Sequence, residues 1–367
     1  MKIKIISVVG ARPNFMKIAP IIEEFGRSCK KSVDHILIHT GQHYSAGMSD
    51  NFFKDLNLPE PDINFNIGSS SHIKQIAEIM IRLEEVLTKE KPQLVIVVGD
   101  VNSTLAAALT ASKLRIKIAH IESGLRSFDF EMPEETNRLL TDHISDFLFC
   151  TEQSAVENLK KEGVKNEKIF FVGNVMIDTL AGNLGRAKNS KILDKLNLKN
   201  DYCLLTAHRP ENVDNEKNLG LLVDLLNEVQ KTITVVYPIH PRSRKMMEKF
   251  GLFGKISSMK NIVICEPLSY LDFLWLVKNS KFVITDSGGL QEETSFLKIP
   301  CITIRKNTER PITVLRGTNK VMGLNTEKVL NEIKEILKGK RKSGDKIELW
   351  DGKASERIVK ILYEKLK

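Results

Sequence analysis

The stretch "LVIVVGDVNSTLAAALTASKLRIKIAHIESG", residues 94–124, contains the pattern that decides the fold. It opens with an apolar, β-branched run at 94–98, continues with a longer run that can be helical at 104–112, and returns to an apolar run at 116–121. Short apolar runs that alternate with amphipathic helices are typical of parallel sheets. The stretch therefore predicts a strand–helix–strand unit.

The same alternation continues along the chain and predicts an α/β fold. Expected strands are Lys2–Val9, His35–His39, Leu94–Val98, Ile116–Ile121, Phe147–Cys150, Ile169–Val172, Tyr202–Thr206, Ile233–Ile239, Ile262–Cys265, Phe282–Thr285 and Cys301–Ile304. One helical stretch, Ile177–Leu193, interrupts the strand pattern. We expect two Rossmann-like domains whose parallel sheets face a central cleft, one of residues 1–174 plus 354–367 and one of residues 175–353.

Composition limits the classes of protein that the chain can belong to. Its 367 residues carry a formal net charge of +9, but the lysines are spread out and no nucleic-acid motif accompanies them. The five cysteines form no CxxC pair, so neither a disulfide framework nor a zinc site is indicated. No run suggests a signal peptide or a membrane span. We expect a cytoplasmic protein that binds neither nucleic acid nor membrane.

Polar residues follow the predicted strands, where parallel sheets bind their ligands. Gly99 and Asp100 come after one strand, and Glu122 after the next. Any of these could simply make a turn or cap a helix. Arg12 and Lys17 are harder to explain without an anion, because two cations at a helix start oppose the helix dipole.

The second half repeats this arrangement. His208 and Arg209 follow one expected strand, and "TDSGGLQEETS", residues 285–295, follows another. A histidine at a strand end can donate to a leaving phosphate or act as an acid or base. The bare backbone of Ser287-Gly288-Gly289 suits an anion.

Several cofactor motifs do not occur. The sequence contains no GxGxxG, no GxxxxGK[ST] and no DxD. His39 and His43 straddle a strand end, and no further ligand spacing supports a metal there. We expect no cofactor and no metal.

Taken together, the motifs resemble the non-hydrolysing UDP-N-acetylglucosamine 2-epimerases over nearly the whole chain. The motifs that carry the resemblance are "VVGARPNFMKIAP" (8–20), "HTGQH" (39–43), "VVGDVNSTLAAAL" (97–109), "HIESGLRS" (120–127), "MPEETNRLLTDHISD" (132–146), "FVGNVMIDTL" (171–180), "LLTAHRPEN" (204–212), "TDSGGLQEE" (285–293) and "TERP" (308–311). The resemblance implies the GT-B architecture, a homodimer, and interconversion of UDP-GlcNAc and UDP-ManNAc for surface polysaccharide or glycan synthesis.

The resemblance also implies roles for residues. Asp100, Glu122 and Glu134 match the family's catalytic carboxylates, and Arg12, Lys17 and His208 its diphosphate side. Further positions match substrate contacts: Ser287, Gly288 and Gly289 for the diphosphate, Glu293 for the ribose, Phe273 for uracil and Arg310 beside the nucleotide. Phe273 as plain helix core is the alternative, and Glu292 is expected to face solvent or its own helix.

The expected chemistry is elimination of UDP to a glycal, followed by re-addition with the proton delivered to the opposite face of C2. Gln42, Arg209 and His240 match residues that hold a second, activating UDP-GlcNAc, whereas Ser45 stands close to the second glutamine of that motif.

Departures from the family pattern leave alternatives open. Asn14-Phe15 and "IHPRSR" (239–244) differ from the usual residues and could change the accepted sugar, for example to a diacetamido-uronic acid. A GT-B glycosyltransferase would share the UDP site but would need an acceptor, a hydrolysing epimerase would release free ManNAc, and a sensor would leave the sugar unchanged.

Overall fold

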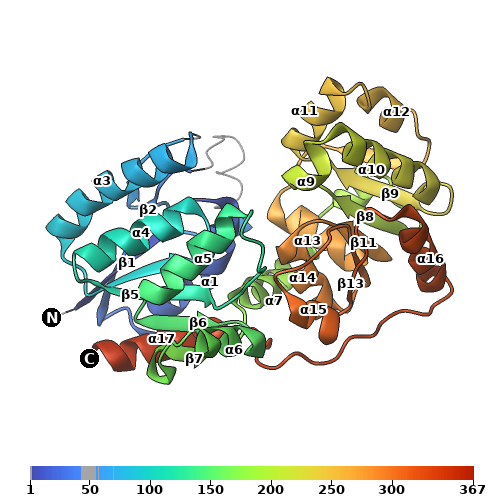
Figure 1. Ribbon diagram of the computed structural model, residues 1–367. Helices are drawn as coiled ribbons and strands as arrows, with labels where there is room; N and C mark the ends of the chain where they lie inside the picture. Colours follow the sequence, from blue (N-terminus) through green and yellow to red (C-terminus); the bar gives the residue numbers. More distant parts are fainter. Residues whose placement is uncertain (1, 43–54, 57, 69) are drawn as a thin grey trace. The chain divides into compact units, whose positions relative to one another are not determined.

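The chain forms two compact units (Figure 1). The computed structural model describes residues 2–42, 55–56, 58–68 and 70–367, except for the side chain of Arg12. The first unit is Met1–Gly182 with Glu348–Lys367, and the second is Asn183–Ile347. The domain limits at 174 and 354 that we expected from the sequence lie close to these bounds and remain a prediction.

The first unit is built on a seven-stranded parallel sheet in the order β3-β2-β1-β4-β5-β6-β7. Its strands are β1 Ile3–Val9, β2 Val33–His39, β3 Ile63–Asn64, β4 Leu94–Val98, β5 Lys117–Ser123, β6 Phe147–Cys150 and β7 Ile169–Phe171. Its helices are α1 Arg12–Ser28, α3 His72–Glu90, α4 Asn102–Lys113, α5 Pro133–Ile144, α6 Gln153–Lys161, α7 Val175–Ala187, which runs into the second unit, and α17 Ala354–Leu366.

Burial on both faces explains the apolar strands of this sheet. All of β4 is buried, with α3, α4 and α5 side by side on one face and α1 on the other (Figure 1). The expected final helix, α17, packs against α1, and Asp178 of α7 accepts the Ala354 and Ser355 N–H groups at its start. A C-terminal segment thus completes the first unit.

The second unit repeats the design with a six-stranded parallel sheet, in the order β10-β9-β8-β11-β12-β13. Its strands are β8 Tyr202–Thr206, β9 Thr234–Pro238, β10 Ile262–Cys265, β11 Phe282–Thr285, β12 Cys301–Thr303 and β13 Asn319–Val321. Its helices are α8 Ile192–Lys195, α9 Pro210–Val213, α10 Glu216–Val229, α11 Pro241–Lys249, α12 Phe253–Ser257, α13 Tyr270–Asn279, α14 Gly288–Leu297, α15 Pro311–Leu315 and α16 Thr326–Leu337. The two sheets confirm the expected α/β class.

Each sheet has one point where the strand order reverses. It lies between β1 and β4 in the first unit and between β8 and β11 in the second. Loops at the carboxyl ends of such neighbouring strands diverge and leave a crevice, which is where open parallel sheets bind ligands. These two reversals therefore locate the candidate site residues.

Three details of the sequence-based prediction were wrong. The helical stretch 177–193 is two helices, because α7 ends at Ala187 and α8 starts at Ile192. Strands β3 and β13 were missed; with two and three residues, they are too short to show an alternating pattern.

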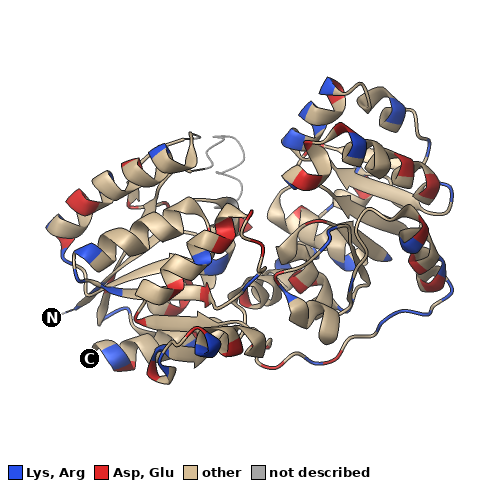
Figure 2. Cartoon of the chain, in the orientation of Figure 1, with Lys and Arg blue, Asp and Glu red and all other residues tan. Residues whose placement is uncertain are grey.

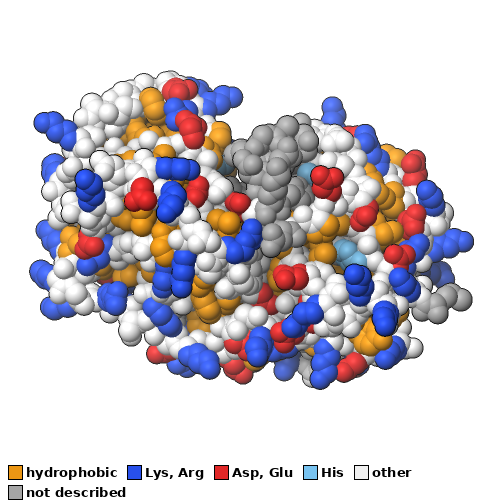
Figure 3. Space-filling view, turned by 180° about the vertical axis from the view of Figure 1, so that it is seen from behind, with side chains coloured by type: hydrophobic (Ala, Val, Ile, Leu, Met, Phe, Trp, Pro, Cys, Tyr) orange, Lys and Arg blue, Asp and Glu red, His pale blue; other side chains and the backbone are white. Residues whose placement is uncertain are grey.

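Basic and acidic residues are interspersed along the helices and loops of both units (Figure 2). The back view shows Lys and Arg interspersed with Asp and Glu, and apolar side chains between them (Figure 3). Within the described part of the chain, no helix has the length and apolar composition needed to cross a membrane.

Candidate active site

The β1–α1 turn of the first unit is held by Asn14. Its Oδ1 accepts the N–H groups of Gly10 at 3.3 Å and Ala11 at 3.1 Å, and its Nδ2 donates to the carbonyl of Val98 at 2.9 Å. This buried amide thus ties the turn to the end of β4. The residue that departs from the family pattern serves the backbone, and the turn starts the helix that carries Arg12 and Lys17.

Lys17 and Glu122 form a buried ion pair at the strand-order reversal. The Nζ of Lys17 contacts Oε2 of Glu122, and their side chains are 8% and 4% exposed. A Cβ at Gly99 would lie 3.1 Å from Lys17 Nζ and 3.2 Å from Glu122 Oε2. Gly99 also has φ +68°, so both its conformation and its neighbours require glycine.

Glu122 has an unusual backbone conformation. Its φ is +70°, and the pairing of β5 with β6 shifts register between Ile121 and Ser123. A non-glycine residue with positive φ costs roughly 1–3 kcal/mol and persists only where its surroundings enforce it, most often at functional sites. This conformation marks Glu122 as a functional candidate independently of its family match.

A buried histidine and aspartate hold the chain on both sides of Glu122. Asp142 accepts from His120 Nδ1 at 2.6 Å and from the Gly124 N–H at 3.0 Å, while His120 Nε2 contacts the carbonyl of Gly99 at 2.8 Å. Arg126 also pairs with Asp142 at 2.7 Å. Burial acts to raise the pKa of Asp142, but His120 and Arg126 keep it below its ordinary value.

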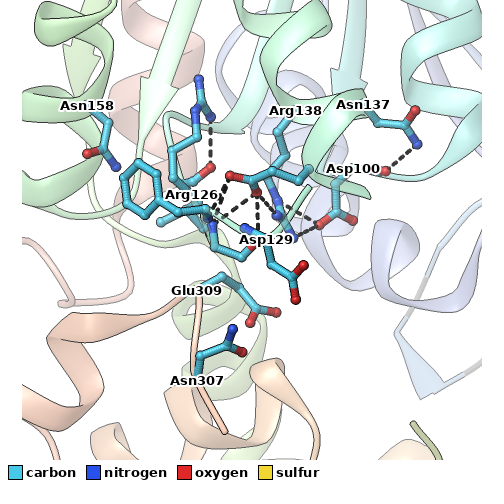
Figure 4. A network of polar contacts seen from close by, with 12 residues as sticks. Asp100, Arg126, Asp129, Asn137, Arg138, Asn158, Asn307 and Glu309 are labelled. Atoms are coloured by element: carbon cyan, nitrogen blue, oxygen red, sulfur yellow. Dashed lines mark hydrogen bonds and ion pairs between the residues drawn. The ribbon is translucent and has the colours of Figure 1, made fainter. Parts of the chain in front are cut away.

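Asp100 is held by an arginine on α5 (Figure 4). Its Oδ2 accepts from Arg138 Nη2 at 2.7 Å and Nε at 3.1 Å, and its backbone carbonyl accepts from Asn137 at 2.8 Å. The Asp100 side chain is 25% exposed, so solvent and ligands can reach it. A bidentate arginine fixes the direction of a carboxylate.

Glu134 lies half-buried in the first turn of α5. Its neighbour Glu135 accepts the backbone N–H groups of Ser127 and Phe128 and pairs with Arg138 at 2.5 Å. Burial acts to raise the pKa of Glu135, but these donors hold it below its ordinary value. Of the three predicted carboxylates, Asp100 and Glu122 sit at adjacent strand ends, and Glu134 projects from the following helix.

In the second unit, His208 follows β8 and is bound by Asp286, which follows β11. Asp286 is fully buried, and its Oδ2 accepts the N–H groups of His208 and Arg209, both at 2.9 Å. The ring Nδ1 of His208 lies 3.2 Å from Asp286 Oδ1. Asp286 therefore holds both the backbone and the ring of His208 at the second strand-order reversal.

The predicted anion turn is the start of α14. Ser287 is its N-cap residue with no hydrogen bond from its side chain to the helix, and the helix begins at Gly288. A Cβ at Gly288 would lie 3.0 Å from Arg310 Nη1, so the glycine allows the guanidinium to approach the turn. Glu293, in the second turn of α14, is buried.

The prediction for Glu292 was wrong. This side chain is buried and pairs with Arg310 Nε at 3.0 Å. Glu309 in turn lies 2.7 Å from Arg305, 3.1 Å from Arg310 and 3.7 Å from Arg209. Burial alone would lower the pKa of Arg305, but Glu309 and Glu211 raise it above its ordinary value. Two carboxylates thus fix Arg310 beside the anion turn.

The remaining candidates have local contacts. Phe273, on α13, is half-buried. His240, the N-cap of α11, places its ring 5.4 Å from that of His208. Gln42 accepts from the Ser103 N–H at 3.1 Å and from its hydroxyl at 2.8 Å. Ser45 and His43 lie outside the described residues.

Sequence reasoning placed Asp286 at a strand end but gave it no role, and it gave no role to Glu309 or to the His120–Asp142 pair. Asp286 stands at a strand end beside the predicted turn, so its position was the available signal. Asp142 gave no local signal, because its partners His120 and Arg126 are distant in sequence. Within the described segments, no three His, Cys, Asp or Glu side chains gather in a way that could hold a metal ion.

Comparison with known proteins identifies the family. A family model described as UDP-N-acetylglucosamine 2-epimerase matches residues 27–363. A Methanocaldococcus jannaschii UDP-N-acetylglucosamine 2-epimerase is 48% identical, with 99% of each chain covered. A Pseudomonas aeruginosa UDP-2,3-diacetamido-2,3-dideoxy-D-glucuronate 2-epimerase is 40% identical, with 98% of this chain and 99% of the relative covered.

Among solved structures, that of Methanocaldococcus jannaschii UDP-GlcNAc 2-epimerase in complex with UDP-GlcNAc and UDP has a TM-score of 0.92 and 46% identity, covering 99% of this chain and 100% of the other. The agreement extends over both sheets and both strand-order reversals. On this evidence, the chain belongs to the UDP-N-acetylglucosamine 2-epimerase family.

Proposed function

We propose that this protein interconverts UDP-GlcNAc and UDP-ManNAc by inverting C2 of the sugar. The proposal is supported by the family and by the substrate named for the Methanocaldococcus jannaschii relative. The observation that carries it is the buried Lys17–Glu122 pair beside Gly99 and Asp100, with Glu122 in a strained conformation. Such a set keeps carboxylates in place next to a developing positive charge.

The C2 hydrogen of a sugar becomes acidic when the C1–O bond to UDP begins to break. In the first step a carboxylate takes the C2 proton, the electron pair of the C1–O bond leaves with UDP, and a C1=C2 double bond forms. In the second step a proton returns to C2 from the opposite face while UDP adds to C1. Atoms and electrons balance without an external oxidant or reductant.

Both units supply groups for these steps. Asp100, Glu122 and Glu134 are the proposed carboxylates, and Asp100 is exposed enough to exchange its proton with solvent. We assign the leaving diphosphate to Arg12, Lys17, His208 and the Ser287-Gly288-Gly289 turn. Arg310 beside that turn, Glu293 for the ribose hydroxyls and half-buried Phe273 for uracil complete the proposed substrate contacts.

A single NMR time course tests the activity. UDP-GlcNAc is mixed with purified protein in D₂O, without added metal or NAD. We expect UDP-ManNAc to appear, deuterium at C2 of product and recovered substrate, and slow release of UDP and 2-acetamidoglucal. Epimerisation without deuterium at C2 would exclude elimination, and release of UDP only after addition of an acceptor would indicate a glycosyltransferase.

A second candidate substrate is a UDP-diacetamido-uronic acid, because the Pseudomonas aeruginosa relative matches 98% of the chain. The contacts of Asn14 with the backbone of Gly10, Ala11 and Val98 argue against a role for this residue in sugar choice. A competition assay with both UDP-sugars separates the candidates by kcat/KM. We place the product in surface polysaccharide or glycan synthesis.

Two further expectations belong to this proposal. Sedimentation should show a homodimer.

If Gln42, Arg209 and His240 hold an activating UDP-GlcNAc, reaction from UDP-ManNAc alone should show a lag that a trace of UDP-GlcNAc abolishes. A time course that is linear from the start would contradict activation. Gln42 would then have only a structural role, through its hydrogen bonds with Ser103.

A further inference from the structure

Asp286 has more donors than a helix cap or turn requires. Besides the N–H groups of His208 and Arg209, its Oδ2 accepts from Asn212 Nδ2 at 3.1 Å, while its Oδ1 accepts the His208 N–H at 3.2 Å. The carboxylate is nevertheless also 3.2 Å from the imidazole Nδ1 of His208. A fully buried acidic side chain is thus devoted to one histidine and the residues that follow it.

The hydrogen-bonding pattern determines which ring nitrogen carries hydrogen. Asp286 receives three N–H donors on Oδ2 and behaves as an acceptor throughout. A carboxylate accepts but does not donate, so the nitrogen that faces it must carry the hydrogen. Neutral His208 is therefore the Nδ1–H form, and its other nitrogen, Nε2, is free to exchange a proton.

We propose that Asp286 is a positioning residue that fixes the ring orientation and the Nδ1–H form of His208, so that Nε2 exchanges a proton with the leaving diphosphate. This inference rests on the proposed epimerase function. The protonated ring gives the Nε2 proton to a diphosphate oxygen as the C1–O bond breaks, which leaves the neutral Nδ1–H form, and Nε2 recovers a proton as UDP adds back. Asp286 precedes Ser287 directly, so one residue links the histidine to the anion turn.

The surroundings of His208 determine the sign of the pH effect. Burial lowers the pKa of His208, Asp286 opposes this, and Arg209, Arg242 and Arg305 add to it. The ring of His240 lies 5.4 Å away and is the other titratable group that faces it. Removing the charge of Asp286 should therefore lower the pKa of His208 further and, because the protonated ring donates to the leaving diphosphate, move the alkaline limb of the pH–kcat/KM profile to lower pH.

The test is ¹⁵N NMR of the imidazole groups together with steady-state kinetics on the full-length chain. His208 is assigned from its missing signal in His208→Gln. Asp286→Asn retains an acceptor for the backbone N–H groups but can donate to Nδ1, so we expect the neutral ring to change to the Nε2–H form. kcat should fall about 10- to 100-fold, as is typical when a partner that orients a histidine is lost, with little change in KM.

Asp178→Asn is the matched control. Asp178 is another buried carboxylate, and it accepts the backbone N–H groups of Ala354 and Ser355 and the Ser355 hydroxyl rather than a histidine. It should leave the His208 signal and the pH profile unchanged. An Nε2–H form of His208 in the unmodified protein would overturn the proposal without any variant, as would equal effects of the two substitutions.

Failure of the proposed function is distinguishable from failure of this inference. If the unmodified protein does not epimerise UDP-GlcNAc while Asp286→Asn still changes the tautomer of His208, the function fails and the positioning role stands. If the protein is active but Asp286→Asn leaves the tautomer and kcat unchanged, the positioning role fails alone.

Discussion

The two units use their strand-order reversals differently. In the first unit a cation and a carboxylate, Lys17 and Glu122, neutralise each other in a buried pair under a glycine turn. In the second, carboxylates such as Glu292 and Glu309 hold Arg310 beside a helix start that has no side-chain cap hydrogen bond. The first arrangement suits chemistry at fixed atoms, and the second suits binding of an anion. Substitutions in the Lys17–Glu122 pair should therefore affect turnover and stability, and substitutions at the start of α14 should affect affinity.

The largest expected effect is on turnover. Glu122→Gln removes a group that can take a proton, so kcat should fall by about 10²- to 10⁴-fold, while the Kd for UDP from calorimetry changes little. Glu24→Gln is the control, since Glu24 is a buried carboxylate on α1 that accepts from Arg27 and Ser28 on the same helix. Wild-type turnover in Glu122→Gln would remove Glu122 from the mechanism.

The next effect is on stability. Lys17→Met leaves the buried carboxylate of Glu122 without its cation and should lower the free energy of unfolding in urea by about 3–5 kcal/mol. Lys17→Met/Glu122→Gln should recover part of that loss. In the second unit, Arg209→Met should lower the free energy of unfolding by no more than about 1 kcal/mol, because Glu309 still forms ion pairs with Arg305 and Arg310. Equal losses for both single substitutions would contradict the distinction between the units.

Two glycines sharpen the comparison further. Gly99→Ala must adopt φ +68° and crowd Lys17 and Glu122, so we expect about 1–2 kcal/mol lower stability together with reduced kcat. The measurements are urea unfolding and the NMR time course. Unchanged kcat in a folded variant would show that the contact of Gly99 with the pair is irrelevant to the chemistry.

The smallest effect is expected for Gly288→Ala. A Cβ there would lie 3.0 Å from Arg310 Nη1, which can move because it is the end of a flexible side chain. The substitution should cost one hydrogen bond to the ligand and weaken UDP binding roughly 2- to 13-fold. The free energy of unfolding should stay unchanged. A Gly288→Ala variant that binds UDP normally but turns over slowly would contradict the binding role assigned to the start of α14.

Much of the fold and part of the site follow from local patterns in the sequence. The apolar run at 94–98 must be buried on both faces, which predicts a central parallel strand, and ligand groups must follow such strands. For this reason Asp100, Glu122, His208 and the Ser287-Gly288-Gly289 turn could be selected from the sequence. Pro13 after Ala11 and Gly288 after Ser287 likewise mark where helices start.

Only the tertiary structure decided which of these groups meet. Lys17 and Glu122 are 105 residues apart, and His208 and Asp286 are 78 apart, so no local pattern relates them. The structure also showed that Glu292 faces Arg310 instead of solvent and that Asn14 serves the backbone. The reason is physical: periodicity determines whether a residue lies in a strand or a helix, but the partner of a buried charge is set by strand order, which brings distant loops to one edge of a sheet.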